Sequence, residues 1–522
     1  MQQDLIETAV AFAAQSRAWS DPDYPRFHLA PPRGRLNDPN GLIEANGKFH
    51  AFFQYTPRHP HKEVFWGHAS SADLTTWEHH RPAIAPDSPY DQNGAYSGTA
   101  IATPEGYELW YTGNYKDPKT GIRQATQCLV TSPNLADFHK SPLNPVIAAP
   151  PPGYTAHWRD PQVWQEDDGS YRMLLGTQRA NRTGTALLYR STDRREWTLE
   201  GEISFPDAAG AFASFGYMWE CPNLFSLRDE ATGEIFDVLL FCPQGIEAER
   251  EGFENVFPCI YLVGHLVGIE FRGCTGDFWE LDRGFEFYAP QVFARTPDQQ
   301  PDGSTPRPAL LLGWAGNAGQ DAQPSFEAGD WVHCMTVARE LALRSGRLLQ
   351  RPVLPGLPVE PVELGKLGEL GEPGKSAASA EKSDQGEPPA PTEHASALPV
   401  GQPVRLGGHA GRSWRLRLEG EDLAGLEWQI GGQQAVRFTL ARGQLLVDRS
   451  SSRYPFDKRR TVSLPDPLRS LEVLHDRSVT EVFLNDGELA FTMRSFVDDV
   501  PGVALTASRP LPLRAQFGHF PG

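Results

Sequence analysis

Three acidic residues of the chain stand one or two residues before a proline, at the start of an apolar segment: Asp38, Asp160 and Glu220. Acidic side chains can break a glycosidic bond when two of them flank it. One carboxylate attacks the anomeric carbon, and the other, protonated, gives its proton to the leaving oxygen. Like charges in a partly dry pocket push their pKa values apart, so one acid stays protonated while its neighbour is ionised. This chemistry requires a fold that brings the three residues together.

An aspartate before a proline is by itself a weak signal. The same dipeptide begins at Asp21, Asp117 and Asp466, where a plain turn is the better interpretation. Proline favours an extended conformation in the residue before it, and we expect that conformation at Asp38 and Asp160. What distinguishes these two residues is their position in a repeat.

Five segments of the chain share one pattern, and they recur about every 60 to 70 residues. Each has a polar or proline-containing corner, an apolar strand, a glycine-bearing turn and a second apolar strand, which predicts a β-hairpin. The turns are Asn46-Gly47, Glu105-Gly106, Asp168-Gly169, Thr232-Gly233 and Asp302-Gly303. A second marker, a polar turn that leads to an aromatic residue, recurs later in four of the units and ends at Trp77, Phe138, Trp197 and Trp279.

Four strands in each of five units predict an all-β fold whose first part is a five-bladed β-propeller. The alternative is a β-sandwich with chance spacing, but two independent markers keep the same period. In a propeller the innermost strand of each blade lines the central channel, so residues at the same point of the repeat meet near one axis. Asp38, Asp160 and Glu220 share that point, and we therefore expect them to face one pocket.

The composition divides the chain into four parts. Residues 1–25 predict an N-terminal helix and lead-in, with an amphipathic helix over Leu5–Trp19, and residues 26–355 carry the propeller pattern. Residues 356–402 contain a stretch rich in Gly, Pro, Ala, Ser, Glu and Lys without an apolar period, which predicts a flexible linker. In residues 403–522 short alternating strands return and predict a β-sandwich domain.

The composition also limits the partners. The formal net charge is −18 over 522 residues, which argues against nucleic acid and anionic membrane surfaces. No stretch is apolar for about 18 residues, so we expect no membrane span. The six cysteines form no CxxC pair and indicate reduced thiols and a cytoplasmic location. We expect no metal, because no histidine spacing typical of a metal site is present, and the oligomeric state is left open.

The residues around the three acids resemble a known family. Leu36–Gly41, Trp158–Pro161 and Trp219–Pro222 are similar, in order, to the three signature motifs of glycoside hydrolase family 32, the invertase and fructan hydrolase family. The resemblance covers nearly the whole chain from Tyr24 onward. It implies a five-bladed propeller followed by a β-sandwich, and a reaction that needs no metal or organic cofactor.

The resemblance also implies a role for each acid: Asp38 matches the nucleophile, Glu220 the general acid/base and Asp160 the transition-state stabiliser that holds fructose hydroxyls. The positions that match the lining of the fructose subsite are Asn37, Gln54, Trp66, Tyr96, Ser97, Arg159 and Trp314. Structural alternatives remain open at this point. Trp66 and Trp314 are also suited to the core between blades, and Gln54 to a solvent-facing position.

The leading hypothesis for function is a retaining, exo-acting β-fructofuranosidase. It would hydrolyse the terminal β-D-fructofuranoside of sucrose and short fructo-oligosaccharides through a fructosyl-enzyme intermediate, so the expected partner is a small saccharide. One alternative is a fructosyltransferase, in which a sugar hydroxyl replaces water. Another is a non-catalytic sugar-binding propeller, against which all three carboxylates argue, because binding alone needs no nucleophile. A third is a pentosidase of similar fold, but such enzymes lack the Asn-Asp-Pro-Asn-Gly motif found at Asn37–Gly41.

Overall fold

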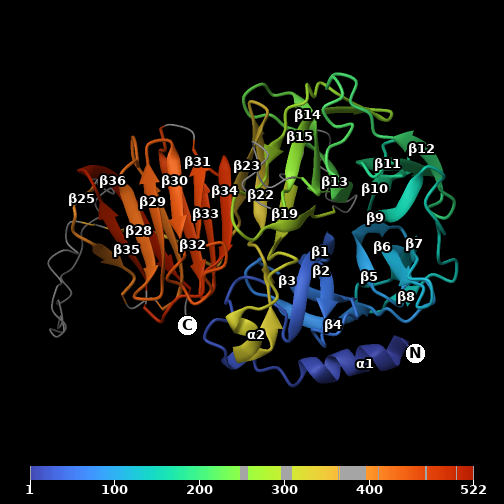
Figure 1. The fold of residues 1–522 in the computed structure, drawn as a ribbon, viewed down its shortest axis with the longest axis horizontal. Helices are drawn as coiled ribbons and strands as arrows, with labels where there is room; N and C mark the ends of the chain where they lie inside the picture. The colour runs from blue at the N-terminus through green and yellow to red at the C-terminus, as the bar shows by residue number, and fades with distance from the viewer. Residues whose placement is uncertain are drawn as a thin grey trace, which may run out of the picture. The chain divides into compact units, whose positions relative to one another are not determined.

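The computed structural model describes residues 2–246, 257–294, 309–362, 364, 396–408, 411–464, 467–500 and 502–520. These residues lie mostly in β-strands, which confirms the predicted all-β class (Figure 1). The described helical elements are α1 (Gln2–Ala13), the 3-10 turn η1 (Ala18–Ser20) and α2 (Pro324–Gly329). The helix predicted over Leu5–Trp19 therefore starts earlier and ends at Ala13. Most of the predicted linker, and the turn at Asp302-Gly303, lie outside the described residues.

Five sheets follow one another along the first part of the described chain. The first contains β1 (Gly34–Ala45), β2 (Lys48–Thr56), β3 (Phe65–Ser71), β4 (Glu78–Ile84) and β20 (Trp331–Val332), and the second β5 (Ala95–Thr103), β6 (Gly106–Lys116), β7 (Arg123–Ser132) and β8 (His139–Lys140). The third contains β9 (Tyr154–Gln165), β10 (Tyr171–Arg179), β11 (Gly184–Ser191) and β12 (Thr198–Glu202). The fourth contains β13 (Met218–Arg228), β14 (Ile235–Gln244), β15 (Ile260–Val267), β16 (Glu270–Arg272) and β17 (Trp279–Glu280). The fifth contains β18 (Tyr288–Val292), β19 (Ala309–Ala315), β21 (Cys334–Met335), β22 (Arg339–Arg344) and β23 (Arg347–Pro352).

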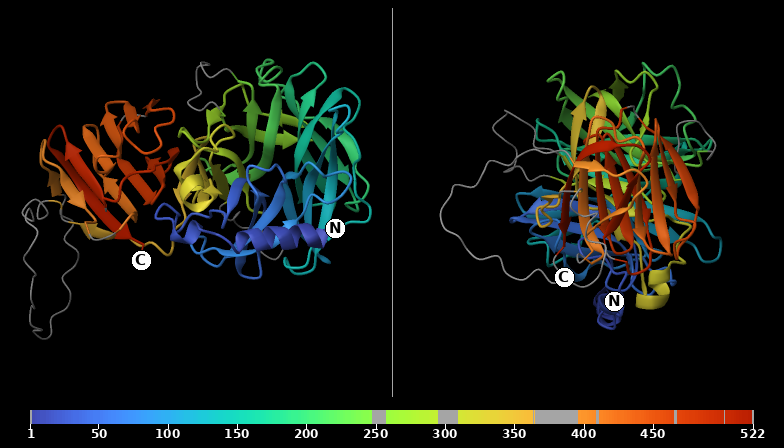
Figure 2. Two further views of the ribbon diagram at one scale, coloured as in Figure 1. Left: turned by 60° about the horizontal axis from the view of Figure 1, so that its bottom comes forward. Right: turned by 90° about the vertical axis from the view of Figure 1, so that its left-hand side faces the viewer.

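The first strand of each sheet contacts the first strands of the two neighbouring sheets. Contacts run from β1 to β5, from β5 to β9, from β9 to β13 and from β13 to β18, and β18 contacts β1 again. The five first strands therefore form a closed ring, around which the other strands of each sheet extend outward (Figures 1 and 2). We call these five strands the inner strands.

Local sequence explains both the hairpins and their packing. Asn46 and Gly47, which join β1 to β2, have φ angles of 52° and 72°, as a tight two-residue hairpin turn requires. Phe52, Trp66 and Tyr111 belong to one buried cluster that joins the first sheet to the second. Burial of a large apolar side chain contributes roughly 1.5–3 kcal/mol, so such clusters hold neighbouring sheets together.

Every inner strand has a β-bulge near the same point of the repeat. Register shifts occur at Leu36/Pro39 on β1, at Tyr96/Gly98 on β5, beside Arg159 on β9, at Glu220/Asn223 on β13 and at Tyr288/Gln291 on β18. Three of these bulges contain a non-glycine residue with positive φ, at Asp160 (64°), Cys221 (48°) and Ala289 (46°). The extended conformation predicted for Asp160 is thus wrong, because the bulge turns its backbone left-handed. Bulges re-aim side chains, and strained backbone of this kind gathers at functional sites.

The chain splits into two compact units, residues 1–356 with 476–496, and residues 357–475 with 497–522. The second unit contains two sheets. One includes β24 (Glu360–Val362), β36 (Leu511–His519), β25 (Ser396–Leu398), β27 (Ser413–Glu419) and β32 (Ser470–Asp476). The other contains β26 (Val404–Leu406), β35 (Val503–Ala507), β28 (Leu426–Gly431), β29 (Ala435–Ala441), β30 (Gln444–Asp448) and β31 (Arg459–Ser463). Trp428 and Phe438 are cross-strand partners there and stack at 4.6 Å.

The hairpin formed by β33 (Val479–Leu484) and β34 (Leu489–Arg494) belongs to the first unit, although the sequence places it with residues 403–522. A fully buried arginine of the first unit contacts both strands of this hairpin. Arg339 of β22 donates to Glu481 at 2.5 Å and to Thr492 at 2.6 Å, and it contacts Asp282 at 3.0 Å. Among the described residues, no helix is both long and apolar enough to cross a membrane.

Candidate active site

Asp38 lies in the bulge of β1, half-buried, with neutral donors on both carboxylate oxygens. Asn37 donates to Oδ1 at 3.0 Å, while Gln54 and Ser97 donate to Oδ2 at 3.0 and 2.6 Å. Asn37 also donates to the amide oxygen of Gln54 at 3.0 Å, which fixes both amides. Gln54 is buried, so the solvent-facing alternative for this residue does not apply. The three donors orient the carboxylate and favour its ionised form.

Asp160 lies in the bulge of β9 and is buried. The backbone amide of Cys221 donates to its Oδ2 at 2.9 Å, and its own backbone amide donates to Thr112 Oγ1 at 3.1 Å. The guanidinium of Arg159 is 4.0 Å from the same Oδ2. The carboxylate of Asp160 is therefore held between its own strand and β13.

Glu220 lies at the bulge of β13 with a side chain that is 15% exposed. Arg159 donates to its Oε1 through Nε at 3.0 Å and Nη2 at 2.5 Å. Gln244 and Tyr288 donate to Oε2 at 2.5 and 2.6 Å. Residues from three different sheets thus position this one carboxylate, which leaves its orientation little freedom.

The three carboxylates influence one another electrostatically. Burial raises the pKa of Asp38, and the charge of Glu220 raises it further, while the hydrogen bonds from Ser97 and Asn37 act in the opposite direction. Burial raises the pKa of Asp160 to about 7, with further contributions from Glu220 and Asp38, and Arg159 opposes the rise. Such mutual shifts let neighbouring acids hold different protonation states near neutral pH.

The two tryptophans predicted to line the subsite, Trp66 and Trp314, are buried, and neither donates a hydrogen bond to the three carboxylates. Trp66 is 0% and Trp314 is 2% exposed, so neither indole face is open to a ligand. Trp66 instead donates to the backbone oxygen of Tyr96 at 3.0 Å, next to Ser97. Trp314 packs edge-on against Tyr288 and lies beneath the Arg35 guanidinium. Both rings are arranged to support residues that contact the carboxylates.

Two donors to Glu220, Gln244 and Tyr288, are absent from the predicted site residues. The repeat contained a signal for each. Tyr288 stands two residues before a proline, as Glu220 does, and Gln244 ends the second strand of its sheet, close to the position of Gln54 in the first. The position of a residue within the repeat therefore indicates the residues that hold the acids in place as well as the acids themselves.

Cys221 lies between two of the acids. Its thiol sulfur is 4.0 Å from Asp38 Oδ2 and 3.7 Å from Asp160 Oδ2. Burial raises the pKa of the thiol well above its ordinary range, and the charges of both aspartates add to the shift. The thiol therefore remains protonated and acts as a weak donor to the carboxylates rather than as a nucleophile.

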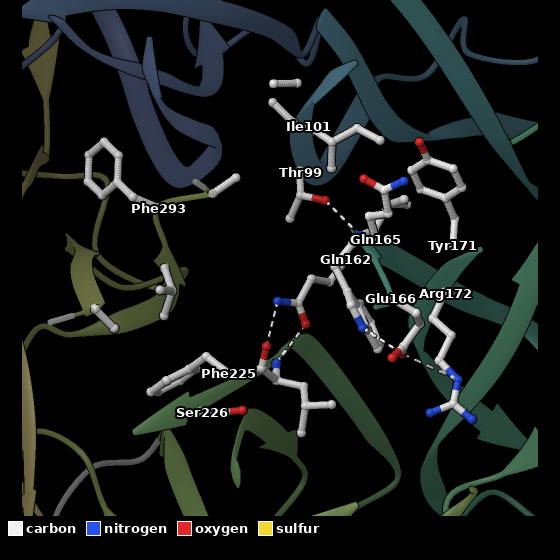
Figure 3. Close-up of a pocket in the computed structure, with 18 of the residues that line it drawn as sticks. Thr99, Ile101, Gln162, Gln165, Glu166, Tyr171, Arg172, Phe225, Ser226 and Phe293 are labelled. Atoms are coloured by element: carbon white, nitrogen blue, oxygen red, sulfur yellow. Dashed lines mark hydrogen bonds and ion pairs between the residues drawn. The ribbon is translucent and has the colours of Figure 1, made fainter. Parts of the chain in front are cut away.

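A cavity of about 560 Å³ lies toward the other end of the inner strands, and none of the predicted site residues lines it (Figure 3). Two of its polar side chains, those of Gln162 and Thr99, are engaged with neighbours. Gln162 donates to the backbone oxygen of Leu224 at 2.9 Å and accepts from the same residue's amide at 2.6 Å. Thr99 donates to the Pro161 oxygen at 2.9 Å. The acids and this cavity thus occupy opposite halves of the inner strands.

Comparison with known proteins gives matches over most of the chain. Residues 28–352 match the family model described as "Glycosyl hydrolases family 32 N-terminal domain", and residues 424–510 match the one described as "Glycosyl hydrolases family 32 C terminal". A sucrose-6-phosphate hydrolase of Bacillus subtilis is 35% identical over 486 residues, which cover 91% of this chain and 90% of that protein.

Solved structures match the chain along its whole length. The structure of sucrose-6-phosphate hydrolase from Lactobacillus gasseri has a TM-score of 0.76 at 26% identity and covers 99% of this chain and 96% of that one. A mutant β-fructofuranosidase of Bombyx mori in complex with sucrose has a TM-score of 0.74 at 27% identity, with 99% and 98% coverage.

Proposed function

Because this chain belongs to glycoside hydrolase family 32 and is therefore a glycoside hydrolase, we propose that it is a retaining, exo-acting β-fructofuranosidase. Its substrates would be sucrose and short fructo-oligosaccharides, from which it releases the terminal β-D-fructofuranosyl unit. The observation that carries the proposal is the cluster of three carboxylates on three inner strands. The Cys221 sulfur lies within 4.0 Å of both Asp38 and Asp160, and Arg159 contacts both Asp160 and Glu220.

The first step assigns different tasks to Asp38 and Glu220. An oxygen of Asp38 forms a bond to the anomeric carbon of the fructosyl unit while the glycosidic bond breaks. Glu220 gives its proton to the departing oxygen, and a fructosyl-enzyme ester remains. Oδ2 of Asp38 accepts from both Gln54 and Ser97, so Oδ1, which accepts from Asn37, is the better-placed attacking atom.

The second step returns the enzyme to its starting state. Ionised Glu220 takes a proton from water, whose oxygen attacks the same carbon and displaces Asp38. Asp160 does not form a bond in either step. It would accept hydrogen bonds from fructose hydroxyls, which strengthen as positive charge develops on the ring. Asn37, Gln54, Tyr96, Ser97 and Arg159 would line the fructose subsite, with Trp66 and Trp314 behind them.

The proposal also covers the arrangement of the sheets within each of the two units. We propose that the ring of five sheets is a five-bladed β-propeller and that a β-sandwich follows it, with bounds at residues 26–355 and 403–522. The closed contact ring of the inner strands supports five blades, and the two sheets of the second unit support the sandwich. The six cysteines are buried free thiols, which supports a cytoplasmic location.

Trapping with methanol tests the proposed reaction. A fructosyl-enzyme intermediate attacked by methanol yields methyl β-D-fructofuranoside, the product of two inversions, and NMR of the product reads its configuration. The α-anomer would contradict the retaining mechanism. Chromatography of the products at high sucrose distinguishes hydrolysis from fructosyl transfer, because transfer yields trisaccharides in place of free fructose. Absence of any turnover would favour a sugar-binding propeller instead.

A further inference from the structure

The cavity at the far end of the inner strands from the acids has no part in the proposed reaction. Its volume is about 560 Å³, within the range of roughly 300–1,000 Å³ that is usual for small-molecule pockets. Residues of β5, β9, β13 and β18 form its wall, and it extends outward to β10, β14 and β15 (Figure 3). None of the three carboxylates, and none of the residues that donate to them, lines it. We call it the distal cavity.

Two partly buried aromatic rings, those of Trp164 on β9 and Phe225 on β13, line the distal cavity. Each packs against a buried apolar cluster, so its position is fixed. The indole N–H of Trp164 donates to Glu166 at 2.9 Å, which also sets the orientation of that ring. The part of each ring that the clusters leave uncovered is an apolar surface that a ligand can contact.

Carboxylates at the edge of the distal cavity have unused capacity to accept hydrogen bonds. Trp164 donates to Oε1 of Glu166, and Oε2 has no donor among the residues that the structure describes. Asp237 accepts from Ser226 at 2.7 Å on one oxygen and from the Leu266 amide at 2.7 Å on the other. Because an ionised carboxylate can accept about four hydrogen bonds, both groups can take further donors from a ligand.

The charges around the distal cavity are mostly negative. Its lining contains three acidic residues, Glu166, Asp167 and Asp237, and Arg172 is the one basic residue among the described lining residues. Arg172 forms an ion pair with Glu200 at 2.8 Å. An anionic ligand would therefore meet a repulsive field, and the cavity suits a neutral ligand that brings its own donors.

We propose that the distal cavity is a second, non-catalytic site that binds an unphosphorylated saccharide of one or two rings. A sugar ring has an apolar C–H face, which can lie against Trp164 or Phe225. It also has hydroxyl donors at its edge, which can reach Glu166 and Asp237. The inner strands place this site away from the acids, so a saccharide bound there is not cleaved. The inference goes beyond the proposed function and does not depend on it.

Calorimetric titration with sucrose tests this inference in Asp38→Ala, which the proposed function predicts to be unable to consume the sugar. We expect two binding sites in each chain. Adding Trp164→Ala, which removes the aromatic surface, or Glu166→Gln, which removes the charge and keeps the shape, should weaken one of the two sites about tenfold. The matched controls are Trp19→Ala and Glu270→Gln, which change exposed residues outside the cavity. An unchanged titration in both cavity variants, or an equal change in the controls, would overturn the inference.

The two sites are distinguishable because a change in one should leave the other intact. Failure of the proposed function would remove the binding event that survives Trp164→Ala, whereas failure of this inference would remove the event that Trp164→Ala weakens. In the otherwise native enzyme, Glu166→Gln should leave kcat on sucrose within about twofold, because this residue lies away from the acids.

Choline is the competing probe, because aromatic rings and carboxylates also suit an organic cation. We expect no choline binding at the distal cavity. If choline binds to the native protein and Glu166→Gln abolishes that binding, the cavity is a cation site and the assignment to a saccharide is wrong.

Discussion

The carboxylate of Asp160 accepts a hydrogen bond at 2.9 Å from the backbone amide of Cys221, the residue that follows Glu220. Both Asp160 and Cys221 have positive φ, at 64° and 48°. The strained bulge of β13 therefore supplies the amide that holds the carboxylate of Asp160, which lies in the strained bulge of β9. Because of this hydrogen bond, the backbone geometry of β13, which carries Glu220, depends on the charge state of Asp160. The strained backbone at Asp160 also costs stability of the fold, in addition to the chemical role of its side chain.

Replacement of Asp160 by Asn should raise stability above neutral pH while it removes activity. The pKa of Asp160 is raised to about 7 from 3.8, so the folded state holds this proton more tightly than the unfolded chain does. The stability that the carboxyl contributes is complete below about pH 4 and is lost as the pH rises through 7. Asn cannot ionise and escapes that loss. Thermal melts of Asp160→Asn and native protein should differ by about 2 °C in favour of the variant near pH 8.

The same melts near pH 4 provide the control for Asp160, because both forms are then neutral and the difference should vanish. A variant that is less stable at both pH values would contradict the pKa assignment. On sucrose, kcat should fall by about a hundredfold or more, because the hydroxyl contacts that strengthen in the transition state are lost.

Ser97→Ala should move the acidic limb of the pH profile. The pKa of Asp38 is already raised by burial, and the hydrogen bond from Ser97 acts to lower it. Without that donor the pKa rises further, so Asp38 ionises at higher pH and the acidic limb of kcat/KM for sucrose moves up the pH scale. Ser226→Ala is the matched control, since this serine donates to Asp237 away from the acids. An unmoved limb in Ser97→Ala would mean that a different group titrates there.

The first unit should depend strongly on one buried arginine. Arg339→Met leaves buried Asp282 without its cation and leaves Glu481 with only His28 as an ion-pair partner, and loss of one partner of a buried pair costs about 3 kcal/mol or more. Arg344→Met, five residues further along the same strand and hairpin, removes an exposed pair with Glu230 and should cost below about 1 kcal/mol. Urea unfolding followed by tryptophan fluorescence measures both. Equal midpoints for the two variants would show that the buried network is not a stabilising feature.

Much of this arrangement was predictable because the chain repeats. Asp38, Asp160 and Glu220 occupy one phase of the repeat, and that phase alone predicts that they meet. The left-handed backbone of Asp160 was not predictable from Asp160-Pro161, because the bulge that imposes it arises from pairing between strands. Composition also could not decide between a binding and a packing role for Trp66, since an indole suits either place. The structure decides for the packing role, because neighbouring residues bury the ring of Trp66 completely.

The roles of Asp38 and Glu220 should separate when the leaving group is varied. Asp38→Ala removes the attacking oxygen, so kcat should fall by about three orders of magnitude or more for every substrate. Glu220→Ala should cause a similar loss on sucrose, whose leaving hydroxyl must be protonated. A fructofuranoside with a p-nitrophenol leaving group departs without that proton, so its bond cleavage should be far less impaired in Glu220→Ala. Circular dichroism of both variants checks that the fold persists. If both lose activity equally on the activated substrate, Glu220 is not the proton donor, and near-native turnover in Asp38→Ala would remove the nucleophile from this site.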